Sequence, residues 1–429
     1  MEDAIGEVLN QLIEKQFSQE KMMLILVKEK IKGYDIELTK SQERNMILHL
    51  QKHGLEGLDR FTFEPNRHQK AILKKSGRED LVIKLDFQQS DLNAFQNKIS
   101  DVVSRLSIET TEWLSDKLNK AWIKQSKSIL KKIKSERHQF ADIHNKIWGK
   151  ALDLLDALFS LSLELGSEST QNFNSTKSND NDIVFHTVRR LHARGCQVSS
   201  EILTLLRGGF ADGAHARWRT LHEISVIAQF LAIHDHELTE RYLAHSDIVD
   251  YQRALQYRKY SDTLSYVPLS DNEFSEIKNT FEMVKAKYGK EFKKTDWVRN
   301  DYWWAAAALK NPHPNFVNIE ERVEVSFMQP FVKLSHINVH AGSKGIFYRL
   351  GSPPNDDLLV AGASIFGVGE PGQNTAYTIS NLTSTLLLYK NNNLDNLGSV
   401  LALRKFMEEV VWEFDRAMEE QEKSHSKAL

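Results

Sequence analysis

The chain has 429 residues, of which 41% are hydrophobic and 27% charged, and its formal net charge at pH 7 is −2. This is the composition of an ordinary globular protein, and the near-zero charge excludes a basic field over the whole surface that would attract nucleic acid. Cys196 is the only cysteine, which excludes an intrachain disulfide and a cysteine-ligated zinc cluster and fits a reducing cytoplasm. The N-terminal segment is acidic and amphipathic, and the longest apolar runs reach about half the length of a membrane span. We therefore expect a cytoplasmic protein without a membrane segment.

Only 8 prolines interrupt a chain whose apolar residues recur at helical spacing. This pattern predicts an all-α protein built as a multi-helix bundle. The first two amphipathic patterns lie in residues 1–30 and 38–53, and a longer helix is expected from about residue 91 to residue 137. We divide the chain into an N-terminal helical region, residues 1–140, and a helical bundle core domain, residues 141–429.

The second half of the chain is expected to contain more helices and one β-hairpin. Residues 166–182 are rich in Ser, Asn and Asp without periodicity, which predicts a loop, and helices are expected again over 183–206 and 212–236. The segments GIFYRLG (345–351) and DLLVAGA (357–363) are separated by the turn-rich SPPND. They predict a small β-hairpin near the C-terminal third, followed by two C-terminal helices.

Six lysines of the predicted long helix are spaced 3, 4, 3, 4 and 3 residues apart, and this spacing aligns them on one helical face. They are Lys117, Lys120, Lys124, Lys127, Lys131 and Lys134, here called the lysine stripe. Leu118, Trp122, Ile129 and Ile133 form an opposing apolar stripe. An anionic partner would relieve the repulsion between the ammonium groups, and a nucleic-acid backbone fits because each neutralised phosphate releases counterions. An acidic protein partner and a solvated helix face that needs no partner are the alternatives.

The run GFADGAHARWRTLHEISVIAQFLA, residues 209–232, combines charged side chains with a strongly apolar end. At about 100° per residue, four polar side chains share one face of this helix: His215, Arg219, His222 and Glu223. Arg217 lies about 140° away from His222 around the helix. Ionised groups are rarely buried unless they are paired. The face therefore predicts either an Arg219–Glu223 ion pair that fixes helix register, or a cleft in which Arg219 holds a phosphate and a histidine moves a proton.

Two further patterns give weaker indications of a ligand site. His336 and His340 are four residues apart and could share a helix face as metal ligands, with Glu223 or His215 as a further ligand, but no recognisable metal motif supports such a site. The segment GVGEPG (367–372) matches GxGxxG only formally, because Pro371 interrupts it and its surroundings are helical rather than βαβ. We expect no metal and no cofactor at these residues.

Three segments together resemble a bacterial domain-of-unknown-function family, number 5677 in that series. They are WGKALDLLDALFSLSLELG, LLRGGFADGAHARWRTLHEISVIAQFL and LSHINVHAGSKGIFYRLG, and the resemblance covers roughly residues 145–390. Its most specific element is ARWRTLHE (216–223), followed by a histidine in the context Val339–Gly342. The resemblance implies a helical bundle in a bacterial cytoplasm, and it places Arg219, Glu223 and His340 at the polar positions of the motif, with His222 within it. In outline the family is similar to helical toxin and defence ribonucleases, a likeness of fold that does not fix function.

The predicted function is that of a bacterial stress or phage-defence effector in which Arg219, His222, Glu223 and His340 line a cleft that binds or cleaves RNA without a metal ion. His340 or His222 would act as general base or acid on a ribose 2′-hydroxyl, and Arg219 would stabilise the charge that develops on the phosphate. Glu223 would orient Arg219 or a histidine. The alternative is a non-enzymatic helical interaction module. In it the Arg219–Glu223 pair is structural, and the lysine stripe binds nucleic acid or an acidic protein; self-association is a further expectation. Exposure of the cluster in a pocket favours the enzyme, and burial with mutual pairing favours the module.

Overall fold

The computed structural model describes residues 19–32, 35–53, 62–75, 77, 83–84, 89–174, 181–289, 300–340, 342–353, 359–390 and 393–428. These residues are helical apart from turns, connecting segments and two paired two-residue strands, β1 (Thr62–Phe63) and β2 (Ile83–Lys84), which confirms the predicted all-α class. No helix in the described ranges is long and apolar enough to span a membrane. Contacts between residues divide the chain into two units, Met1–Ile133 and Lys134–Leu429, which are described separately.

The first unit has a small core formed by short amphipathic helices. It contains α2 (Gln19–Lys32), α3 (Lys40–His53), α4 (Arg67–Lys75) and the first part of α5 (Gln89–Asn174). Ile31 of α2, Met46 of α3 and Leu73 of α4 are buried together. Gln69 of α4 is also buried, and its side-chain nitrogen donates to the backbone carbonyl of Glu37 at 2.6 Å, so its amide is satisfied within the core.

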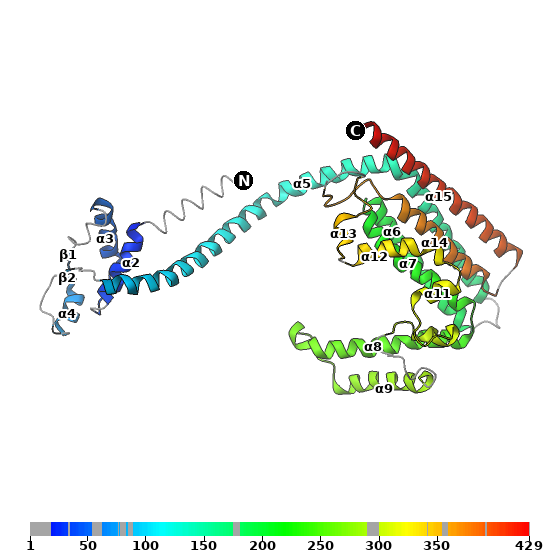
Figure 1. The fold of residues 1–429 in the computed structure, drawn as a ribbon, viewed down its shortest axis with the longest axis horizontal. Helices are drawn as coiled ribbons and strands as arrows, with labels where there is room; N and C mark the ends of the chain where they lie inside the picture. The colour runs from blue at the N-terminus through cyan, green and yellow to red at the C-terminus, as the bar shows by residue number, and fades with distance from the viewer. Residues whose placement is uncertain are drawn as a thin grey trace. The chain divides into compact units, whose positions relative to one another are not determined.

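The second unit is the larger helical bundle (Figure 1). Its longer helices, after the second part of α5, are α6 (Ile183–Arg207), α7 (Ala211–Ala232), α8 (His236–Leu264), α9 (Asp271–Tyr288), α12 (Gln329–Val339), α14 (Gly369–Leu388) and α15 (Leu394–Ala428). Its shorter elements are η3 (Trp303–Ala305), α10 (Ala306–Leu309), α11 (Phe316–Arg322), η4 (Ser326–Met328) and α13 (Lys344–Phe347). The boundaries of α6 and α7 agree closely with the predicted 183–206 and 212–236.

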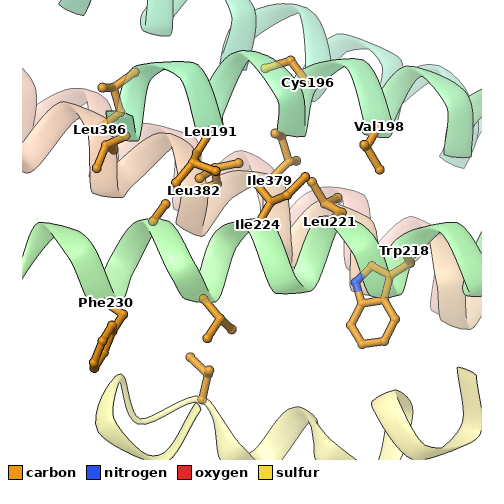
Figure 2. Close-up of a cluster of buried hydrophobic side chains, with 14 of the residues drawn as sticks. Leu191, Cys196, Val198, Trp218, Leu221, Ile224, Phe230, Ile379, Leu382 and Leu386 are labelled. Carbon is orange, nitrogen blue, oxygen red and sulfur yellow. The ribbon is translucent and has the colours of Figure 1, made fainter. Parts of the chain in front are cut away.

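The core of the second unit lies where α6, α7 and α14 meet. Apolar side chains from all three helices interdigitate there, as Figure 2 shows for Leu191, Val198, Leu221, Ile224, Ile379 and Leu382. Trp218 of α7 is fully buried, and its indole nitrogen donates to the carbonyl of Asn374 at 3.1 Å and to the hydroxyl of Thr378 at 2.9 Å, both on α14. Because this large side chain is fixed at both its ring and its polar atom, it sets the rotation of α7 about its own axis.

A tight turn connects α6 to α7 and brings the polar run of α7 back along α6. Gly209 has a φ of +73°, a left-handed conformation that glycine adopts without a steric penalty. The Gly209 carbonyl accepts from the backbone nitrogen of Ser364 at 2.9 Å, and the nitrogen of Phe210 donates to the carbonyl of Leu205 at 2.8 Å. These bonds end α6 and fix the start of α7.

The predicted β-hairpin near the C-terminal third is wrong. Residues 344–347 form the helical turn α13, and the described parts of 348–353 and 359–363 form no strand. The backbone nitrogens of Leu350 and Gly351 donate instead to the carboxylate of Asp212 on α7, at 2.9 and 3.2 Å. The carboxylate of Asp212 therefore accepts hydrogen bonds from backbone nitrogens that, in a hairpin, would donate to the opposite strand. The loop predicted over 166–182 is also shorter than expected, because α5 continues to Asn174; residues 175–180 lie outside the described residues.

Candidate functional site

The polar residues of α7 are divided between the core and the surface. His215, Trp218 and His222 lie on the buried side, with 0%, 0% and 3% of each residue exposed, and their rings follow one another at centroid distances of 5.3 Å. The side chains of Arg219 and Glu223 are 27% and 30% exposed and lie at the boundary with solvent. The single polar face predicted from helical geometry is therefore two environments, because the burial of Trp218 takes the histidines three residues before and four residues after it into the core.

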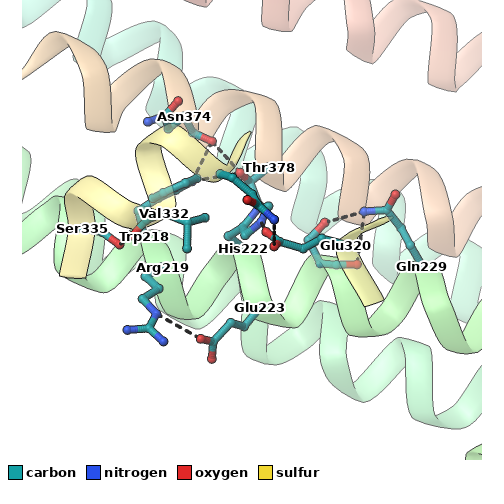
Figure 3. A network of polar contacts seen from close by, with 12 residues as sticks. Trp218, Arg219, His222, Glu223, Gln229, Glu320, Val332, Ser335, Asn374 and Thr378 are labelled. Atoms are coloured by element: carbon teal, nitrogen blue, oxygen red, sulfur yellow. Dashed lines mark hydrogen bonds and ion pairs between the residues drawn. The ribbon is translucent and has the colours of Figure 1, made fainter. Parts of the chain in front are cut away.

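Arg219 and Glu223 form a half-buried ion pair on one side of α7. The Nε atom of Arg219 donates to Oε1 of Glu223 at 3.1 Å, and both side chains extend away from His222 (Figure 3). Burial raises the pKa of the Glu223 carboxyl, while the charge of Arg219 acts in the opposite direction. The terminal nitrogens of Arg219, Nη1 and Nη2, make no hydrogen bond to another described residue. This half of the guanidinium is therefore available to an anion.

His222 forms a buried pair with Glu320 of α11. Its Nε2 lies 2.7 Å from Oε1 of Glu320, whose side chain is 1% exposed. The other carboxylate oxygen of Glu320 accepts from the side-chain nitrogen of Gln329 at 3.4 Å. Phe316 covers the imidazole edge-on, with ring centroids 5.9 Å apart. The pair joins α7 to α11. Because Nε2 of His222 is bonded to Glu320, this nitrogen is not available to a ligand.

His336 and His340 stand at the end of α12, near Arg219. Their rings are perpendicular with centroids 5.9 Å apart; His336 is half-buried and His340 is exposed. The pKa of His336 is lowered first by burial and then by the charges of Arg219 and His340. In the described part of the chain, no three or more His, Cys, Asp or Glu side chains are grouped as metal ligands would be. The structure thus brings Arg219, Glu223 and the two histidines into one electrostatic neighbourhood.

The other candidates on α7 have partners elsewhere. Arg217 pairs with Glu201 of α6, so it does not share the neighbourhood of His222. His215 is fully buried, and neither ring nitrogen has a hydrogen-bond partner among the described residues; Oε1 of Glu370 is 3.7 Å from Nε2. Burial lowers the pKa of His215 to about 4. His215 is therefore a neutral residue of the core at physiological pH.

All six residues of the lysine stripe are exposed on α5. Lys120, Lys124 and Lys127 form no ion pair with any residue that the structure describes. The opposing apolar stripe is also largely open, with Trp122 58% and Ile129 47% exposed. This part of α5 therefore presents a basic face and an apolar face that the described residues leave uncovered.

The segment GVGEPG has a packing role at the start of α14. A β-carbon at Gly369 would overlap the side chain of Met418, and one at Gly372 would overlap the ring of Phe414, both on α15. The glycines therefore allow α14 and α15 to approach closely.

Glu320 could not be identified from the sequence. It lies 98 residues after His222, and nothing in the sequence around it indicates that α11 packs against α7.

Residues 185–357 match the model of DUF5677, a family of unknown function. The match includes all of α7 and the segment around His340, and it confirms the family resemblance for this region, which is shorter than the predicted 145–390. Comparison with curated proteins and with solved structures finds no match. The likeness to helical toxin and defence ribonucleases stays a prediction.

Proposed function

We propose that this protein is a bacterial stress or phage-defence effector that binds RNA at Arg219 and cleaves it without a metal ion. The observation that carries the proposal is the state of Arg219. Its guanidinium is held by Glu223 through Nε alone, while Nη1 and Nη2 remain available at a half-exposed position beside His336 and the exposed His340. A forked donor of this kind suits the paired oxygens of a phosphate.

In the proposed reaction, the 2′-hydroxyl of a ribose attacks the adjacent phosphate, and the bond to the 5′-oxygen of the next nucleotide breaks. The lowered pKa of His336 keeps its imidazole unprotonated near neutral pH, so it can accept the 2′-hydroxyl proton. His340, which is exposed, donates a proton to the leaving oxygen. Arg219 stabilises the negative charge on the phosphate, and Glu223 orients Arg219. His222 acts as a positioning residue, since its Nε2 is bonded to Glu320.

The test is to incubate the purified protein with total RNA, with and without a chelator. We expect cleavage that resists the chelator and leaves 2′,3′-cyclic phosphate ends. Arg219→Ala and His340→Ala should remove the cleavage without lowering the melting temperature appreciably. Arg217→Ala is the matched control, because it removes an arginine of similar exposure from another face of the same helix. RNA that stays intact with the unmodified protein, or cleavage that the chelator stops, would contradict the proposal.

The lysine stripe is proposed to contribute to RNA binding through its uncovered basic face. Changing Lys120, Lys124 and Lys127 to Glu should abolish retention on heparin and on immobilised RNA, and the affinity of the unmodified protein should fall steeply with added salt. The control variant carries the same charge change at three exposed lysines of the first unit: Lys52, Lys74 and Lys75. Equal retention of the two variants would show that the stripe is only a solvated face.

A second candidate function, a helical interaction module, is favoured by the exposed apolar side of α5. Trp122, Ile123, Ile129 and Leu130 are between 47% and 64% exposed. Apolar side chains that recur along a helix and remain uncovered are typical of an association surface, and we take a second copy of α5 as the partner. Sedimentation velocity should then show a dimer that the double change Trp122→Glu with Ile129→Glu dissociates. A monomer at all concentrations would eliminate this candidate.

A further inference from the structure

A groove of about 1160 Å³ lies in the second unit, away from the residues of the proposed RNA site. Three stretches line it: residues 229–236 at the end of α7 and the start of α8, residues 322–325 at the end of α11 and after it, and residues 377–390 of α14 and the turn that follows it. None of the four predicted catalytic residues is among them. Its volume exceeds the range of typical small-molecule sites, roughly 300–1,000 Å³, so a small ligand would fill only part of it.

The floor of the groove is a polar stripe on α14, a helix that is otherwise mainly buried. Tyr377, Asn381, Ser384 and Thr385 are half-buried and share one helical face. The hydroxyls of Ser384 and Thr385 each donate to a backbone carbonyl one turn earlier, at 2.8 Å, so their remaining lone pairs can accept from a ligand. The side-chain amide of Asn381 bonds to no other described residue. The floor therefore offers both donors and acceptors beside an aromatic ring.

The rim of the groove carries donors suited to a phosphate. Arg322 is exposed, and its guanidinium makes no hydrogen bond to another described residue. The Nδ1 atom of His234 lies 2.7 Å from the carbonyl of Phe230 and so carries a proton, and the Nε2 atom of this groove-lining residue bonds to no other described residue. Helix α8 begins at His236, and the positive end of its dipole is at this rim.

The acidic side chains at this end of the groove differ in whether they already have a hydrogen-bond or ion-pair partner. Asp235 caps α8 by accepting from the nitrogen of Leu238 at 3.0 Å. Asp182, whose side chain contacts Lys390 at 2.7 Å, also caps α6. Glu324 is exposed, and its carboxylate bonds to no other described residue, so it is the acid whose charge opposes an anion most directly. Glu324 and Lys390 have positive φ, at 61° and 51°, and each follows the end of a helix, α11 and α14, where a left-handed residue is common.

We propose that this groove binds a nucleotide, with the base and ribose on the α14 floor and the phosphate at Arg322. The ring of Tyr377 offers a stacking surface, and Asn381 can pair with the edge of a base. Ser384 and Thr385 accept from ribose hydroxyls, which are donors as well as acceptors. Arg322 and the start of α8 contact the phosphate. This site is separate from the proposed RNA site, and its occupancy is measured without reference to RNA cleavage.

The experiment is isothermal titration of the full chain with the four ribonucleoside 5′-monophosphates, and with adenosine and inorganic phosphate as separate arms. We expect at least one monophosphate to bind more tightly than either adenosine or phosphate alone. Arg322→Gln and Asn381→Ala should each weaken that binding about tenfold or more, the effect of losing a charge-assisted or polar contact. Glu324→Gln should strengthen it, because it removes the opposing charge. Arg253→Gln, an exposed arginine of α8 outside the groove, should change nothing.

Three results would overturn the proposal, provided that thermal melts show folded variants. The first is the absence of binding by all four monophosphates at about 1 mM, a concentration above the dissociation constant of typical specific sites. The second is binding of inorganic phosphate as tight as that of the nucleotides, because the floor would then contribute nothing. The third is nucleotide binding that Arg322→Gln, Asn381→Ala and Glu324→Gln all leave unchanged, because the ligand would then lie elsewhere.

Discussion

The His222–Glu320 pair and the Arg219–Glu223 pair should differ several-fold in their contribution to stability. His222→Ala leaves the carboxylate of Glu320, which is 1% exposed, with only the 3.4 Å bond from Gln329. Stranding a buried charge in this way costs about 3–5 kcal/mol of unfolding free energy. Arg219→Ala leaves a half-buried carboxylate that is 30% exposed and can be hydrated, so its cost should be about 1 kcal/mol or less, near the upper end for surface ion pairs.

Thermal and urea melts followed by circular dichroism measure the difference. The second unit spans Lys134–Leu429. At about 2.1 cal/mol/K of unfolding entropy per residue, 1 kcal/mol corresponds to about 1.5–2 °C in a unit of this size, so His222→Ala should lower the melting temperature by roughly 5–10 °C and Arg219→Ala by about 2 °C at most. The double change His222→Leu with Glu320→Leu should recover most of the loss, because no unpaired charge remains.

Equal destabilisation by Arg219→Ala and His222→Ala would contradict this prediction, since the different burial of the two pairs would then have no energetic effect. A double variant no more stable than His222→Ala would also contradict it, because the loss could not be attributed to the stranded carboxylate of Glu320. Glu320→Gln separates charge from shape in the same melts. It keeps a hydrogen-bonding side chain of nearly the same size, and it should be milder than His222→Ala.

Further predictions concern buried histidines and close helix packing. Burial lowers the pKa values of His192 and His215 from 6.5 to about 4, so both stay neutral in the folded protein while the unfolded chain takes up protons below about pH 6.5. The contribution of the two neutral histidines to stability should therefore be complete above about pH 6.5 and be lost toward pH 4, by about 1.4 kcal/mol per histidine at pH 5.5. His215→Leu should reduce the shift in urea midpoint between pH 7 and 5.5. An unreduced shift would contradict the lowered pKa of His215. Gly372→Ala should cost about 1–3 kcal/mol, because its new β-carbon overlaps Phe414. Gly398→Ala on α15 meets open space and should stabilise by about 0.5–1 kcal/mol; equal melting temperatures for the two variants would count against the packing argument.

The helices could be predicted from the sequence because their signal is local. Apolar residues at helical spacing located α6 and α7 to within a few residues, and the turn at Gly208–Gly209 marked the boundary between them. The hairpin failed for the opposite reason. The apolar residues of 345–351 resemble a strand, but Asp212, more than 130 residues earlier, accepts the backbone donors of Leu350 and Gly351. A hydrogen bond between residues so far apart in the chain cannot be predicted from the hydrophobic pattern of a short segment.

The candidate site could be predicted only in part. Helical geometry correctly placed Arg219 beside Glu223, since partners four residues apart meet on any helix. It could not show where the core boundary crosses α7, because that depends on the contacts of Trp218 with α14. The partner of His222 was out of reach for the same reason, since Glu320 lies on a separate helix that only the tertiary fold brings to α7.

The position of Trp218 also bears on where this protein can be cut. The family match ends at residue 357, whereas α14, which accepts the indole hydrogen bonds and covers the apolar side of α6 and α7, begins at Gly369. A fragment of residues 185–357 would carry the most recognisable part of the sequence and yet expose Trp218 and the leucines beside it to water. The part of the chain that folds on its own therefore extends beyond the matched segment, through α14 at least, and we expect shorter fragments to aggregate.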